Sequence, residues 1–461
     1  MCRGRPRDDR PREGRAPGAM SETRAFVGPV VDKGRYLIKV PGEWNGTLIL
    51  YSQGPPAPTE DPTWRADNPT LQALLVRGYA VAGWTNPVFW PLEHSFPNQL
   101  AVLDEFDTLV GRPERTIAYG QSIGSFITAG LVQRLGARLD GAVAVCGPLA
   151  GGIAIQNREL DIAFTFKTLL APDSALDVVR IRRPGENLRL ALEILEEAAA
   201  TPEGRARLAL TAAVSNVPGS PDPLSTTSDP RALVDRQIEW YRQIVFLVTF
   251  QARAIVEQRA GGNFSWNTGV DYRDLLERSI NAREVAALYA EAGLDLAADL
   301  RRLAEAPRIE ADPGAVAYLE RNIVYDGQLA VPVVTMHTTG DGLCTPDHEH
   351  AYAEAVRAAG RAQLLRQLWV RRDGHCTFTI AETFTALDVL RARLDGGTWP
   401  ATDADTLNRS AARQDELIGV LVGPHGEGGA ATEPAFCEFS PWPFSRPYDG
   451  RSIGRPSRAT P

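Results

Sequence analysis

The chain has few histidines and cysteines and lacks long apolar runs, the features that would indicate a metal site, a disulfide-rich protein or a membrane span. It holds only six histidines and five cysteines among 461 residues. An odd number of cysteines without a repeating spacing indicates a reducing compartment rather than a disulfide framework. No stretch approaches the roughly eighteen uninterrupted apolar residues of a membrane span. We therefore expect a cytoplasmic protein without a membrane span.

Basic clusters and metal-ligand patterns are scarce as well. The net charge is −8, and no basic stripe follows the arginine-rich N-terminus, which excludes nucleic acid as a partner. Residues 1–19 lack the hydrophobic run of a secretory signal, so they are expected to be a disordered leader. No histidine, cysteine and acid cluster has the spacing of a zinc site. We expect neither a metal nor a cofactor.

The most informative feature that is present is a nucleophile motif. Residues 120–124 are Gly-Gln-Ser-Ile-Gly, a G-x-S-x-G pattern. Residues 115–119 before it are typical of a buried strand, and residues 126–134 after it are typical of a helix. A tight turn from strand to helix needs glycine on either side of the serine, and it lifts the hydroxyl to the positive end of the helix. Ser122 is thus the predicted nucleophile.

An acid and a base follow in a consistent order. Asp341 comes just after a hydrophobic strand predicted at 331–337, and His375 lies between another predicted strand and the last helix of the pattern. The order serine, aspartate, histidine, with each residue beyond a strand, predicts a catalytic triad. Asp341 could instead be a turn residue, since Gly-Asp-Gly is common in turns. Asp347 is the rival acid, although its place favours the start of a solvated helix over 348–359.

With these motifs the chain resembles the α/β-hydrolase superfamily, on its serine esterase and lipase-like side, over about residues 26–394. The resemblance implies an α/β fold with a mostly parallel twisted sheet and helices on both faces. It also implies an oxyanion hole formed by backbone N–H groups of Ile123 and of Gln53 or Gly54. Cys376, beside the predicted base, is interpreted as a packing neighbour.

Between the strands that carry the serine and the acid, residues 157–325 are predicted to be helical throughout. The resemblance implies that this insertion is a cap over the active site, and a separate helical domain is the alternative. Gln121 and the aromatic residues Trp84, Phe264 and Trp266 are candidate substrate-binding residues, although Phe264 and Trp266 could equally form a helix corner. The predicted organisation is a leader (1–19), a core in two parts (20–156 and 326–396), the cap (157–325) and a partly disordered C-terminal extension (397–461).

These predictions indicate an enzyme that cleaves a carboxylic ester of a small hydrophobic or aromatic substrate through an acyl-enzyme on Ser122. The alternative is an acyltransferase or cyclase, similar to a biosynthetic thioesterase, which uses the same triad with an acceptor other than water. A peptidase or amidase ranks below both. The partner is a small ester or acyl compound, and nothing in the sequence indicates an oligomeric state.

Overall fold

A mixed sheet forms the centre of the computed structural model, which describes residues 22–31, 34–54, 68–85, 90, 92–414, 420–422 and 428–448. The sheet has eight strands: β1 (Arg24–Pro29), β2 (Arg35–Val40), β3 (Thr47–Ser52), β4 (Ala80–Trp84), β5 (Arg115–Gln121), β6 (Gly141–Val145), β7 (Val333–Gly340) and β8 (Leu365–Asp373). Their spatial order is β1-β2-β4-β3-β5-β6-β7-β8. The first two strands pair antiparallel with each other, and β2 pairs antiparallel with β4. All later pairs, from β3·β4 to β7·β8, are parallel. The mostly parallel sheet predicted from the sequence is confirmed.

Helices cover both faces of this sheet, because its central strands are apolar on both sides. On β3, Leu48 and Leu50 pack into one hydrophobic cluster, and Ile49 and Tyr51 pack into the cluster on the opposite face. The covering helices are α1 (Pro69–Val76), α2 (Leu92–Leu109), α3 (Ile123–Leu135), α13 (Asp347–Ala358) and α14 (Ile380–Gly396). The alternation of strands and helices brings the carboxyl ends of the parallel strands to one edge of the sheet.

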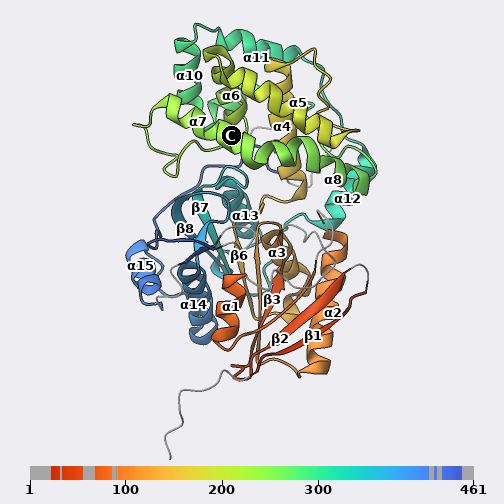
Figure 1. The fold of residues 1–461 in the computed structure, drawn as a ribbon, viewed down its shortest axis with the longest axis vertical. Helices are drawn as coiled ribbons and strands as arrows, with labels where there is room; N and C mark the ends of the chain where they lie inside the picture. Colours follow the sequence, from red (N-terminus) through yellow and green to blue (C-terminus); the bar gives the residue numbers. More distant parts are fainter. Residues whose placement is uncertain are drawn as a thin grey trace, which may run out of the picture.

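A run of helices separates β6 from β7, and no strand occurs in residues 146–332, all of which the structure describes. The run consists of α4 (Gly152–Leu170), α5 (Pro184–Ala199), α6 (Pro202–Ala213), α7 (Pro230–Trp240), two π-helical turns (Tyr241–Val245 and Val248–Ala252), α8 (Arg253–Ala260), α9 (Tyr272–Glu277), α10 (Ala282–Glu291), α11 (Leu296–Glu305) and α12 (Pro313–Asn322). Most of these helices gather above the sheet, and α4 leads from the sheet into them (Figure 1). They have a hydrophobic core of their own. The first helix begins at Gly152, five residues before the predicted boundary at Asn157.

The C-terminal extension contains more structure than the sequence indicated. It adds α15 (Ala404–Ala412) and two short strands, β10 (Val420–Val422) and β11 (Gly428–Ala431). The strand β10 pairs antiparallel with β11 on one side and with β9 (Phe378–Thr379) on the other. Residues 436–448 of this extension lie against the rest of the chain, and two of their aromatic side chains, Trp442 and Phe444, are buried. The leader and the last residues lie outside the described part. In that part, no helix has the length and apolarity needed to cross a membrane.

Candidate active site

A strained turn carries Ser122 between β5 and α3. The backbone of Ser122 has φ 55° and ψ −123°, a conformation that a non-glycine residue rarely adopts. The two glycines of the motif make the turn possible. A Cβ atom on Gly120 would lie 2.3 Å from the Gly124 carbonyl oxygen, and one on Gly124 would lie 2.1 Å from the Ser52 carbonyl oxygen. Both positions therefore require glycine, and the second lets the loop after β3 lie against the start of α3.

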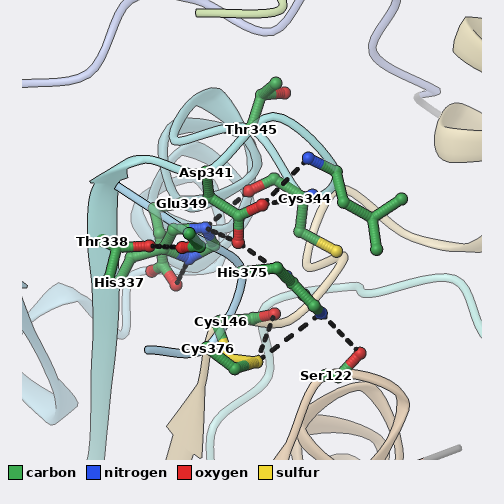
Figure 2. Close-up of polar contacts among 12 residues, drawn as sticks. Ser122, Cys146, His337, Thr338, Asp341, Cys344, Thr345, Glu349, His375 and Cys376 are labelled. Atoms are coloured by element: carbon green, nitrogen blue, oxygen red, sulfur yellow. Dashed lines mark hydrogen bonds and ion pairs between the residues drawn. A yellow bond between two sulfur atoms is a disulfide. The ribbon is translucent and has the colours of Figure 1, made fainter. Parts of the chain in front are cut away.

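The three predicted residues meet at the carboxyl edge of the sheet (Figure 2). The Nδ1 atom of His375 lies 2.7 Å from Asp341 Oδ2, and its Nε2 atom lies 2.8 Å from Ser122 Oγ. Because the carboxylate accepts, Nδ1 carries the proton, and the neutral ring presents the lone pair of Nε2 to the serine hydroxyl. This is the tautomer that a general base needs. Ser122 retains 7% exposure and the His375 side chain 9%, whereas Asp341 is fully buried.

Asp341, not Asp347, contacts the histidine. The second carboxylate oxygen of Asp341 accepts hydrogen bonds from the backbone N–H groups of Leu343 and Cys344, at 2.9 and 3.0 Å. Asp347 begins α13 and accepts from Thr345 Oγ1 and Asn216 Nδ2, at 2.5 and 3.2 Å. Burial raises the pKa of Asp347 to about 6. The prediction of a solvated start for this helix is wrong, because the C-terminal extension covers it: the Phe444 ring lies 4.7 Å from that of the fully buried His348.

The predicted oxyanion donors lie beside the serine. Ile123 is the first residue of α3, so its N–H group has no carbonyl acceptor within the helix. Gln53 and Gly54 directly follow β3, and the close approach of Ser52 to Gly124 places this loop against the turn that carries Ser122. Gln121 is the buried last residue of β5. Main-chain donors at the start of a helix suit a negative charge that develops on a carbonyl oxygen.

A disulfide fastens the histidine loop to the sheet. Cys146, which follows β6, is bonded to Cys376, which follows His375, across 230 residues of sequence. Both cysteines are fully buried. The expectation that the cysteines form no disulfide is therefore wrong for this pair, and Cys376 is more than a packing neighbour. Sequence spacing did not reveal the pair, because only the fold brings the ends of two distant strands together.

We expect the double variant Cys146→Ala/Cys376→Ala to lose both stability and activity. The crosslink restricts the unfolded chain, an effect of about 2–5 kcal/mol, and a loosened His375 loop displaces the base from Ser122. The melting temperature should fall, and kcat should fall by about tenfold to a hundredfold. Cys437, which is unpaired, provides the control: Cys437→Ala should alter neither quantity. Wild-type kcat in the double variant would show that the crosslink does not hold the base.

The candidate substrate-binding aromatics are packed into the structure. Trp84 ends β4 at 2% exposure, and Phe264 is fully buried, with the Arg253 guanidinium 4.5 Å from its ring centroid. Trp266 is half-buried, and its ring lies 6.1 Å from that of Tyr448 in the C-terminal extension. These contacts match the helix-corner alternative for Phe264 and Trp266. Their role in substrate binding stays a prediction.

One group of side chains in the described part of the chain has the proximity of a metal site. It consists of Cys146, His375 and Cys376, whose potential ligand atoms lie within 4.8 Å of one another. The two sulfur atoms are bonded to each other, so they are not the thiolates that metals require. His375 is already engaged with Ser122 and Asp341. The residues present fit acid–base chemistry better than metal coordination.

Comparison with known proteins shows what the chain is similar to in sequence and in structure. The chain is 32% identical to o-phthalyl amidase from Xanthobacter agilis over 420 residues, which cover 84% of this chain and 90% of the relative. No protein-family model matches. Among solved structures, an esterase from Aspergillus oryzae is similar at 14% identity, with a TM-score of 0.41 and coverage of 82% of this chain and 80% of that chain. Feruloyl esterase B from Aspergillus oryzae is similar at 12% identity, with a TM-score of 0.39 and the same coverage of both chains.

Proposed function

We propose that this chain, which belongs to the α/β-hydrolase superfamily and within it to the family of o-phthalyl amidase, cleaves a carboxylic acyl compound through an acyl-enzyme on Ser122. The chain is a hydrolase of the esterase and amidase type. The observation that carries the finer proposal is the continuous hydrogen-bonded series from Ser122 Oγ through His375 to Asp341.

Each residue of the series has a defined task in this proposal. His375 Nε2 removes the hydroxyl proton as Ser122 Oγ attacks the substrate carbonyl carbon, and the resulting imidazolium donates a proton to the leaving group. Asp341 holds the ring in its tautomer and stabilises the imidazolium. The N–H groups of Ile123 and of Gln53 or Gly54 hold the oxyanion. Water, activated by the same histidine, then releases the acid and restores the serine.

Amides as well as esters fit this chemistry. An amine leaves only after protonation, and the His375 imidazolium is placed to supply that proton. The family relative is named for an amide of the o-phthalyl group, an aromatic acyl group with a neighbouring carboxyl. We therefore propose an aromatic acyl substrate. The sequence alone ranks the amide below the ester, but the similarity to an amidase makes the two equal candidates for the scissile bond.

A matched panel of substrates tests the proposal. We expect the enzyme to cleave the ethyl ester and the anilide of the same aromatic acid, benzoic or o-phthalic. With hydroxylamine present, both should give hydroxamate and acid in the same ratio, because one acyl-enzyme partitions between the two acceptors. Different ratios from ester and amide would exclude a common acyl-enzyme. If hydroxamate were the main product even at a low concentration of hydroxylamine, the acyltransferase alternative would be favoured.

A further inference from the structure

A second pair of histidine and carboxylate lies directly behind Asp341. His337, on β7, and Glu349, on α13, are both fully buried. His337 Nδ1 lies 3.3 Å from Glu349 Oε1, and His337 Nε2 lies 2.6 Å from the carbonyl oxygen of Cys344. The same Nε2 atom is 3.6 Å from Asp341 Oδ2 (Figure 2). The imidazole therefore sits between two buried carboxylates.

The partners of this ring indicate that it carries two protons. A carbonyl oxygen only accepts, so Nε2 must donate to Cys344. A lone pair on Nδ1 would face an oxygen of Glu349 and repel it. The other oxygen of Glu349 accepts from Thr335 Oγ1 at 2.5 Å and Gln367 Nε2 at 2.6 Å, and two donors on one oxygen favour the ionised carboxylate. The remaining proton therefore belongs on Nδ1, which makes the ring an imidazolium.

The charges around His337 support this assignment. Burial disfavours the charged ring, but the contact with Glu349 and the negative charges of Glu349 and Asp341 outweigh it, so the pKa of His337 is raised. From β8, the ring of Trp369 faces the imidazole at 6.2 Å. From α13, His348 is a further titratable neighbour; burial and the positive charges of Arg158 and His337 hold its pKa well below the usual value. His348 is thus neutral and accepts from the backbone N–H of Ala150 at 3.2 Å.

We propose that His337, held as an imidazolium by Glu349, is a positioning residue that keeps Asp341 ionised and sets the lower pH limit of activity. This inference rests on the proposed function, in which protonation of the His375–Asp341 dyad removes the general base. A proton added to either member of the dyad is repelled by the positive charge of His337. The dyad therefore stays unprotonated to lower pH than it would without His337, and the more distant Glu349 cancels only part of that effect.

The double variant His337→Gln/Glu349→Gln removes both charges and keeps amide groups that can hydrogen-bond. We expect the acidic midpoint of the kcat/KM profile to move upward by roughly half a pH unit to one pH unit, because protonation of the dyad becomes easier. The matched control is His348→Gln, which replaces a neutral buried ring beside Glu349 and should leave the midpoint in place. A uniform loss of rate in the double variant with an unmoved midpoint would mean a purely structural role and overturn the proposal.

A second measurement is independent of activity. The wild-type protein, labelled with ¹⁵N in its six histidines, gives ring-nitrogen resonances, and the one missing in His337→Gln belongs to His337. We expect both nitrogens of His337 to remain protonated at pH values at which an ordinary histidine has already lost one of its ring protons. A neutral His337 ring at pH 7 would overturn the inference even if Ser122 proves to be the nucleophile. Conversely, the His337 ring could be charged while the Ser122→Ala enzyme remains active. That result would contradict the proposed function and leave the charge assignment of His337 intact.

Discussion

Replacement of Ser122 with alanine is expected to lower kcat for ester and amide hydrolysis by on the order of 10⁵-fold or more, which in practice abolishes activity. The reason is that Ser122 Oγ is the hydroxyl oxygen that lies within hydrogen-bonding distance of the His375 base, at 2.8 Å. Labelling by a fluorophosphonate probe should disappear with the activity. The backbone of the turn does not depend on the hydroxyl, so the melting temperature should not fall.

A neighbouring serine gives the matched control for this variant. Ser125 lies three residues further along, is fully buried in α3 and has no hydrogen bond to His375. Ser125→Ala should retain probe labelling and most of kcat. Undiminished labelling of the Ser122→Ala protein would show that another residue is the nucleophile and would remove the basis of the proposed mechanism.

The elements around the nucleophile could be predicted because local sequence determines them. Residues 115–119 and 141–145 lie in buried strands, and the glycines around Ser122 indicate the tight turn between the first of these strands and α3. The order of Ser122, Asp341 and His375 placed all three beyond strands of one parallel sheet, and the structure brings them into hydrogen-bonding distance. Such features depend on short stretches of chain and on a topology that the alternation of strands and helices restricts to few possibilities.

What the sequence did not reveal depends on contacts between distant segments. Nothing near Cys146 indicates that it lies beside Cys376. Arg446 of the C-terminal extension contacts the helical region. Its guanidinium donates two hydrogen bonds, of 2.9 and 3.0 Å, to the fully buried carboxylate of Asp161. His337 was recognisable only as a residue within a strand, because its partner Glu349 lies on the helix that follows the acid loop.

The second large effect is expected at Asp341, the acid that contacts His375, and not at the nearby Asp347. We expect Asp341→Asn to lower kcat by about 10³- to 10⁴-fold. The backbone N–H groups of Leu343 and Cys344 would hold the amide oxygen, as they now hold Oδ1. The amide nitrogen, a donor, would then face His375 Nδ1 and force the ring proton onto Nε2. The lone pair that should accept the Ser122 proton would be gone.

Asp347→Asn provides the comparison, because Asp347 is equally buried and lies six residues away. Its partners are Thr345 and Asn216 rather than His375, so this substitution should change kcat by less than about fivefold, within the range of indirect effects. Steady-state kinetics of both variants near pH 8, with circular dichroism to verify folding, decides between the two acids. If Asp347→Asn were the more damaging substitution while both proteins remained folded, the histidine would take its orientation from Asp347 during the reaction, and the hydrogen bond between Asp341 and His375 would not be the one that catalysis uses.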